Sequence, residues 1–453
     1  MQRRILLAVS VLGAVGATVV AVAQQPVTPP VAPPTVPTAD PVPPAPPRTL
    51  PKMPPAIPMG PGTPATPAAN ETPLSQFDPL SAFSHQTQAA VRGVLLGANW
   101  MTRVNQPQGR FLFGYNPALR QAMPGDHDLK QARGVLALAQ AAHFTGDEKQ
   151  TAIASQAVLT MLAATRPDPA DPNCRVPGHA SMLCNRVGFA SLVALAIYEL
   201  PGADAKLIAE AEKLCEFLHK QCRPDGSVHY TDNPTDDSTK IDPEGVNEYP
   251  GMALHAIMAG NRVKPAAWKT EAVKKGMEHY RAVFRGKPHP LLAATLTPAF
   301  AELYLQTKLG DAAVAVYEMN DWLCRLQSPG NDPRTPQWAG GFRSVADGRQ
   351  VDAAPGPETG LYVQSLGFAC MLTRMTPDLD RHAKYKAIVT DAARFLTELQ
   401  YLEGNTRHFE NAFRASMLIG GFHLSPADGN LRIDATGSAV TGLLRFLSSG
   451  AEK

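Results

Sequence analysis

Four acidic side chains occupy similar places in the sequence, each close to the start of a segment that carries almost no charge. They are Asp128, Glu248, Glu358 and Asp434. Carboxylates that face one another across a cleft can act as general acid and general base on a glycosidic bond. We therefore predict these four residues as catalytic candidates, provided that the fold brings the starts of their segments together.

Other polar and aromatic side chains lie near the same segment starts or in the loops before them, and we predict that they contact a substrate. They are His127, Tyr249, His255, Trp338, Tyr362 and Arg432. A tyrosine or histidine base beside an arginine that neutralises a uronate would suit elimination or epimerisation rather than hydrolysis. Each candidate also has a structural explanation, because acids cap helices and apolar helices often contain a packed tyrosine or histidine.

From residue 75 onward, helical segments of two kinds alternate. One kind is amphipathic and covers roughly residues 87–104, 148–164, 204–221, 266–284, 312–327 and 384–400. The other kind is almost free of charge and begins near Gly134, Val187, Tyr249, Pro290, Thr359 and Ala435. A helix that is apolar on every face must be buried on every face. The alternation predicts a single all-α domain over residues 75–450, an (α/α)6 toroid in which charged helices surround charge-free ones.

The connections that enter the charge-free segments are long, whereas those that leave them are brief. The long ones cover residues 105–126, 165–179, 222–247, 328–357 and 401–433, and only 285–289 is short. Antiparallel hairpins would place these long loops on one rim, over the barrel mouth, and such loops usually carry function. The loop 222–247 is rich in acids that would suit either solvent or calcium. We predict no metal and no other cofactor.

Several charged segments end in the same pattern of an aromatic and an aliphatic residue, a glutamine a few residues later, and then a glycine turn. Trp322-Leu323 with Gln327 and Phe395-Leu396 with Gln400 fit best, and Gln221 and Gln106 are looser members. A glutamine at a helix C-terminus can hydrogen-bond the free carbonyls there and tie the turn to the next hairpin.

These repeats resemble the QW-type motif of the terpenoid-cyclase and prenyltransferase toroids, which include squalene cyclases. The chain lacks the Asp-x-Asp-Asp motif of class II cyclases, so cyclase activity is not expected. The toroid also resembles six-hairpin glycosidases, glucuronyl epimerases and polysaccharide lyases. That resemblance implies a protein that binds or processes carbohydrate at the barrel mouth. The alternative is a non-catalytic interaction module on the same scaffold.

The N-terminal residues have the composition of a targeting segment followed by a spacer. Residues 1–23 combine two arginines, an apolar run and small residues before Gln24, which predicts a signal peptide; the alternative is a retained membrane anchor. Both interpretations place the remainder outside the cytoplasm. Residues 24–74 are rich in proline and predict a disordered linker. An extracellular polysaccharide or another envelope component is the expected partner.

Charge and cysteine content narrow the expectations further. A net charge of +2 with both signs interspersed gives no indication of a nucleic-acid partner. Six cysteines suit an exported protein, in which disulfides persist. Cys174 and Cys184 bracket a short loop, and we predict a disulfide between them; His179 lies between the two, but this spacing matches no common zinc site.

Overall fold

The computed structural model describes residues 80–346, 349–376 and 378–451. The predicted signal peptide (1–23) and linker (24–74) lie outside these ranges. Within them, six outer helices alternate along the chain with six inner ones. The outer helices are α1 (His85–Arg103), α3 (Glu148–Ala163), α5 (Ala205–Gln221), α8 (Ala267–Gly286), α10 (Gly310–Leu323) and α12 (Leu379–Glu398). The inner helices are α2 (Asp128–Thr145), α4 (Arg186–Glu199), α7 (Tyr249–Val263), α9 (Pro290–Thr307), α11 (Thr359–Met375) and α14 (Ile433–Ser448).

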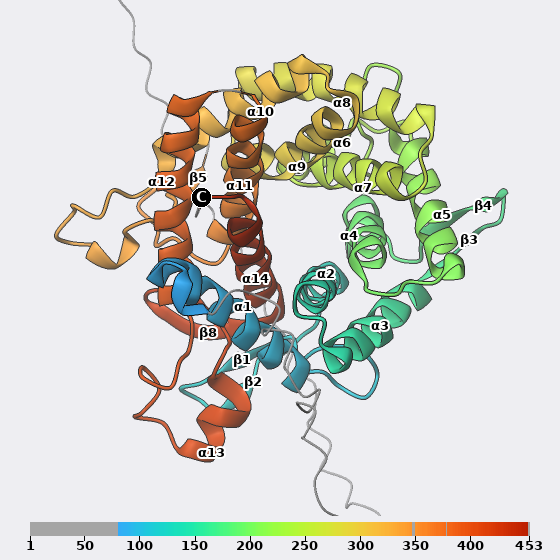
Figure 1. The fold of residues 1–453 in the computed structure, drawn as a ribbon. Helices are drawn as coiled ribbons and strands as arrows, with labels where there is room; N and C mark the ends of the chain where they lie inside the picture. The colour runs from blue at the N-terminus through green and yellow to red at the C-terminus, as the bar shows by residue number, and fades with distance from the viewer. Residues whose placement is uncertain (1–79, 347–348, 377, 452–453) are drawn as a thin grey trace, which may run out of the picture. The chain divides into compact units, whose positions relative to one another are not determined.

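The inner helices form a closed circle in which each one packs against the next, and α14 packs against α2 to complete it. Figure 1 views this circle along its axis and shows the outer helices around it. The inner positions belong to the charge-free segments: in α4, every residue from 187 to 197 is buried. The predicted (α/α)6 toroid, with charge-free segments inside and amphipathic ones outside, is confirmed.

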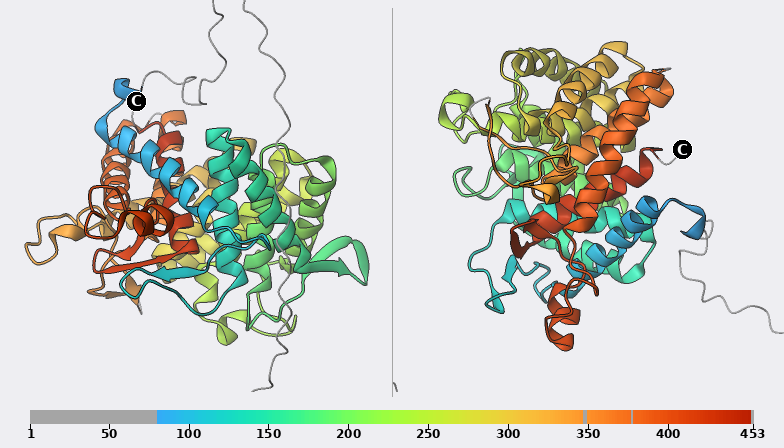
Figure 2. Two further views of the ribbon diagram at one scale, coloured as in Figure 1. Left: turned by 90° about the horizontal axis from the view of Figure 1, so that it is seen from below. Right: turned by 90° about the vertical axis from the view of Figure 1, so that its left-hand side faces the viewer.

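Short strands lie in the long loops, where the sequence showed no strand signal. One four-stranded antiparallel sheet has the order β2 (Gln121–Ala122), β1 (Gly114–Asn116), β8 (Asp428–Arg432) and β7 (His423–Ser425). Two hairpins, β3 (Thr165–Asp168) with β4 (Asp171–Pro177) and β5 (Val345–Ala346) with β6 (Arg349–Gln350), lie in other loops. The pairing of Gly114 with Arg432 joins the first and last long loops, and Figure 2 shows these strands side by side.

The remaining elements are brief. The loop before α7 contains α6 (Ser238–Ile241) and a 3-10 turn at Gly245–Asn247, and the loop before α14 contains α13 (Asn411–Phe413) and a π-helical turn at Arg414–Leu418. Further 3-10 turns occupy Leu80–Ala82, Cys324–Leu326 and Pro336–Trp338. None of the helices in the described part of the chain is long and apolar enough to span a membrane.

The glutamine pattern ties neighbouring outer helices together, as predicted for its best members. The Gln327 side-chain amide donates to the carbonyl oxygens of Gly340 (3.1 Å) and of Ile388 on α12 (2.8 Å). Gln400 donates in the same way to Gly420 (3.0 Å) and to Gly93 on α1 (2.9 Å). The backbone bridges Gln327–Phe342 and Gln400–Phe422 recur at Asn105–Phe111 and Cys222–Val228. In the hairpins that begin with α1 and α5, the bridging residue is therefore the neighbour of the glutamine that the pattern indicated.

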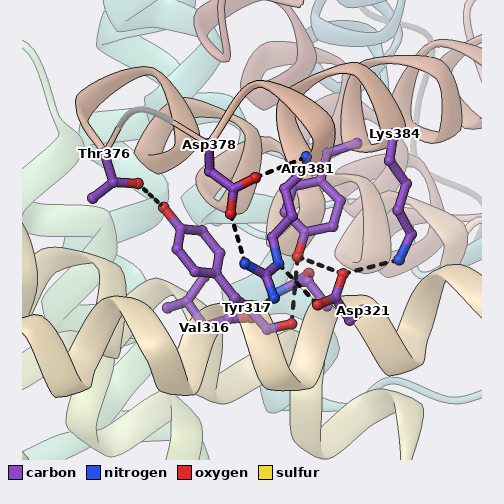
Figure 3. A network of polar contacts seen from close by, with 9 residues as sticks. Val316, Tyr317, Asp321, Thr376, Asp378, Arg381 and Lys384 are labelled. Atoms are coloured by element: carbon purple, nitrogen blue, oxygen red, sulfur yellow. Dashed lines mark hydrogen bonds and ion pairs between the residues drawn. The ribbon is translucent and has the colours of Figure 1, made fainter.

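A polar network on the outer wall joins α10 to α12 (Figure 3). The Asp321 carboxylate accepts hydrogen bonds from Arg381 (3.0 Å), Lys384 (2.9 Å) and Tyr385 (3.1 Å). Burial alone would raise the pKa of Asp321, but these three donors outweigh it and hold the pKa below its usual value. Asp378 caps the first turn of α12 and pairs with Arg381 as well.

The predicted disulfide between Cys174 and Cys184 is wrong, because both residues are buried free thiols in separate environments. Cys174 lies on β4 beside Lys220 of α5, on the outer side of the ring. Cys184 lies before α4, close to Asp128 and Leu129 of α2. The short loop between them therefore crosses from the outer layer to the mouth instead of folding back on itself.

We expect Gln400→Ala to destabilise the toroid by roughly 2 to 4 kcal/mol, because two carbonyl groups lose their donor in a buried site. Gln106→Ala is the matched control: its side chain is exposed, so less than about 0.5 kcal/mol is expected. Urea unfolding followed by circular dichroism measures both. Equal losses in the two variants would contradict the proposed role of Gln400.

Candidate active site

A cavity of 960 Å³ opens at the rim where the inner helices begin. Its walls come from the first turns of the inner helices and from the long loops that lead into them. Six of the predicted residues line it: Glu248, Glu358, Asp434, His127, Tyr249 and Arg432. Four do not: Asp128, His255, Trp338 and Tyr362. The mouth therefore collects three of the four candidate carboxylates.

Glu358 stands directly before α11 and is half-buried at the mouth. Its side chain makes no capping hydrogen bond to the helix; one carboxylate oxygen accepts from the backbone N–H of Gly356 (2.9 Å). Burial raises the pKa of Glu358, and the backbone donors and Arg432 offset this only in part. The carboxyl group is thus held closer to neutrality than an ordinary glutamate, as a proton donor requires.

Asp434 lies in the first turn of α14 and forms a two-pronged ion pair with Arg432, at 2.9 and 2.7 Å. The hydrogen bond to Asp434 is the main reason that the pKa of Arg432 is raised. Arg432 ends β8, and the pairing of its backbone with Gly114 of β1 positions the residue at the mouth. Arg432 also interacts electrostatically with Glu358, so one arginine faces both carboxylates. Two acids in different surroundings therefore share one site.

Glu248 pairs with a residue that the sequence did not indicate. The Arg133 guanidinium of α2 contacts the Glu248 carboxylate at 2.6 Å, across the space between α2 and α7. Arg133 directly precedes the charge-free run that begins at Gly134. Its place directly before that charge-free run was the signal that could have identified it. Tyr249 and Tyr230 line the cavity beside this pair, with their ring centroids 5.9 Å apart.

Asp128 serves the scaffold rather than the cavity. Its carboxylate contacts Arg110 at 2.5 Å and forms a second, short contact with the imidazole Nε2 of His179. These contacts attach the loops before α2 and before α4 to the start of α2. The assignment of Asp128 as a catalytic candidate is not supported by this geometry, because its carboxylate binds the two loops and does not line the cavity. Helix periodicity alone could not show which acid turns toward the mouth.

The other three candidates also lie outside the cavity. His255 lies deeper in the ring, on a separate void of 50 Å³, and burial lowers its pKa to about 3. Tyr362 is buried and packs edge-to-face on Phe342 at 5.3 Å, and burial raises its pKa. Trp338 is half-buried in the turn that Gln327 stabilises.

Acids from the loop 222–247 also line the cavity, namely Asp232, Asp236 and Asp242. Most of their oxygens serve local structure. Asp232 accepts two hydrogen bonds from Ser181 (both 2.8 Å), and Asp242 accepts from the backbone of Gly245 (2.9 Å). Among the described residues, no group of three or more His, Cys, Asp or Glu side chains is placed to hold a metal ion.

The sequence matches no protein-family model, and no curated protein matches it. The fold has clear counterparts among solved structures, and these define the class as six-hairpin (α/α)6 toroids. The unsaturated glucuronyl hydrolase from Bacillus sp. GL1 superimposes with a TM-score of 0.57 and 12% identity, over 79% of this chain and 96% of that one.

Two further structures share the fold. A D-mannose isomerase gives a TM-score of 0.55 at 11% identity, over 81% of this chain and 99% of that one. The GH76A α-1,6-mannanase from Salegentibacter sp. HEL1_6 gives 0.52 at 12% identity, over 80% and 99%. At such low identity the likeness concerns the fold, and the function must be argued from the site.

We expect Glu358→Gln to gain stability relative to the native chain as the pH rises. A raised pKa means that the folded state binds this proton more tightly than the unfolded state, so the stabilisation is present at low pH and is lost as pH rises through the folded pKa. Glutamine cannot ionise and avoids that loss. Urea unfolding at about pH 4 and about pH 8 measures the change.

Glu278→Gln is the matched control for this experiment, because Glu278 is exposed on the outer helix α8. Its stability difference from the native chain should vary little between the two pH values. A Glu358→Gln difference that is the same at both values would show that the Glu358 carboxyl ionises as easily in the folded chain as in the unfolded one.

Proposed function

We propose that this protein binds and processes carbohydrate at the barrel mouth, by acid–base cleavage of a glycosidic bond. The observation that carries the proposal is the contrast between Glu358, whose pKa burial raises, and Asp434, which is ion-paired with Arg432. Pairs of carboxyl groups whose surroundings differ in this way are typical of acid and base roles at one site. The shared fold of the glucuronyl hydrolase and the mannanase supports the proposal without establishing it.

In this mechanism Glu358 donates its proton to the oxygen of the leaving group as the glycosidic bond breaks. A water molecule adds to the anomeric carbon, and Asp434 accepts the proton that this water loses. The net reaction is hydrolysis, with the proton balance carried by the two carboxyl groups. Arg432 keeps Asp434 oriented and contributes positive charge near both groups.

The charge of the cavity favours a neutral or basic sugar over a uronic acid. Six carboxylates line it, and the only lysine or arginine side chains among its lining residues are Lys130, Arg133 and Arg432. Both arginines are already paired with carboxylates. A uronate would therefore enter an acidic cavity without an unpaired guanidinium to receive it.

The alternative chemistry, elimination or epimerisation by a tyrosine base, finds less support. Burial raises the pKa of Tyr249, which keeps its hydroxyl protonated and makes it a weak base. Arg432 would have to leave Asp434 before it could neutralise a uronate. The proposed hydrolysis needs no deprotonated tyrosine, and it leaves Arg432 paired with Asp434.

We further propose that the protein is exported and acts on an extracellular or envelope polysaccharide, on the basis of the N-terminal sequence. A non-catalytic interaction module on the same scaffold is the second candidate. The open cavity with three candidate carboxylates favours the enzyme, because apolar side chains would fill the mouth of a purely structural ring.

The full chain, screened for binding and hydrolysis against a panel of neutral, amino and uronic glycans, tests the proposal. We expect a neutral or amino glycan to be cleaved, and Glu358→Gln and Asp434→Asn each to lower kcat by roughly a hundredfold or more while binding persists. Glu278→Gln, on the outer wall, should retain full activity. Binding without turnover in every variant would favour the interaction module, and exclusive cleavage of uronic glycans would overturn the charge argument.

A further inference from the structure

The rim of the mouth cavity carries apolar side chains that the proposed reaction does not use. Met182 is 90% exposed, Leu183 73% and Ile241 65%, and all three line the same cavity as the carboxylates. Elsewhere on the described surface, exposed large apolar residues such as Leu379 lie outside this cavity. Single exposed apolar residues need no explanation, whereas a group at the edge of a cavity often marks a ligand surface.

These three residues are held in place by the two loops that carry them. Met182 and Leu183 precede α4, and Ile241 ends the short helix α6. Ser181, next to Met182, donates from both its backbone N–H and its hydroxyl to Asp232 at 2.8 Å. The Asn185 amide donates to the Tyr230 carbonyl oxygen at 2.9 Å. The two loops thus form one wall, and its exposed apolar edge is part of a hydrogen-bonded structure.

The same cavity also contains aromatic and charged side chains. Tyr230, Tyr249 and the Arg133–Glu248 pair line it together with the apolar edge. Aromatic rings suit the faces of sugars, and the charged pair suits their hydroxyl groups. A ligand that fills this cavity would be polar where it meets the carboxylates and apolar where it passes over the edge.

Resting on the proposed function, we infer that the substrate is a glycoconjugate with an apolar aglycone. The sugar occupies the acidic floor, and the alkyl, aryl or isoprenoid group attached to it covers Met182, Leu183 and Ile241. The continuity of this edge with the carboxylate cavity is what selects this occupant. A second copy of the chain would instead have to cover the mouth and its six carboxylates.

Isothermal titration of the full chain with matched methyl and octyl glycosides tests the inference. The probes are the β-D-glucopyranoside and α-D-mannopyranoside pairs, used below the concentration at which the octyl members form micelles. In at least one pair we expect the octyl member to bind on the order of tenfold more tightly, because the alkyl chain is removed from water when it packs on the apolar edge. The double variant Met182→Ser/Leu183→Ser and the single variant Ile241→Ser should reduce that ratio, the double variant to about twofold or less.

Leu379→Ser is the matched control, because Leu379 is 80% exposed on α12 and does not line the cavity. It should leave the octyl-to-methyl ratio unchanged. Serine at such exposed positions should not disturb folding, and the unfolding midpoint of each variant checks this. Equal affinities for the octyl and methyl members, or a ratio that survives the rim variants, would overturn the inference.

Two other outcomes separate this inference from the proposed function. If glycans are cleaved but octyl glycosides bind no more tightly than methyl glycosides, the apolar aglycone is rejected and the proposed glycosidase function stands. No binding of any glycan or glycoside rejects both. Light scattering that reveals a dimer in the native chain and a monomer in Met182→Ser/Leu183→Ser identifies a second copy as the occupant and rejects the aglycone.

Discussion

The structure depends on closing a ring, and in its outer layer the Gln400 side chain joins the last outer helix to the first. Its amide group reaches Gly93 on α1 and Gly420 in the following turn, both through backbone carbonyls. Gly420 has φ of +96°, and a Cβ there would lie 2.1 Å from the Leu96 carbonyl oxygen on α1. Glycine is therefore required at the point where the end of the chain docks on its beginning. Gln327 and Gly340 join α10 to α12 in the same way. The contact that joins the ends of the chain is therefore of the same kind as one between consecutive outer helices.

Ring closure also determines what the mouth contains. Once α14 lies between α11 and α2, the last long loop meets the first, and β8 pairs with β1. That pairing places Arg432 and, two residues later, Asp434 beside the cavity. The inner helices all begin at this rim, so their positive dipole ends surround it and favour carboxylates there. Acids gather at the mouth for this reason, and only their local contacts distinguish a structural acid such as Asp128 from an available one such as Glu358.

The sequence predicted the ring but not the direction of each side chain within it. Charge-free and amphipathic segments differ in every helical turn. Many residues therefore contribute to the prediction of the ring, and a wrong interpretation of a few of them does not alter it. A site residue depends on one side chain. Asp128 and Glu248 both stand at the start of an inner helix, yet one binds two loops and the other lines the cavity. Arg133 was not predicted because it is one of three charged residues in the first turns of α2, and periodicity does not show which of them faces the cavity. Most of the short strands were missed because they have only two to five residues, too few for an alternating pattern, and β8 pairs with β1 more than 300 residues away.

The cavity combines two features that oppose stability, and their combination is informative about function. Glu358 is buried enough to resist ionisation, and Met182 and Leu183 expose apolar surface to water. Folds tolerate such unfavourable positions where a ligand later compensates them. A sugar that hydrogen-bonds the acidic floor and an apolar group that covers the edge would compensate both at once. The opposing chemistry of floor and edge therefore points to one amphipathic ligand more directly than either feature alone.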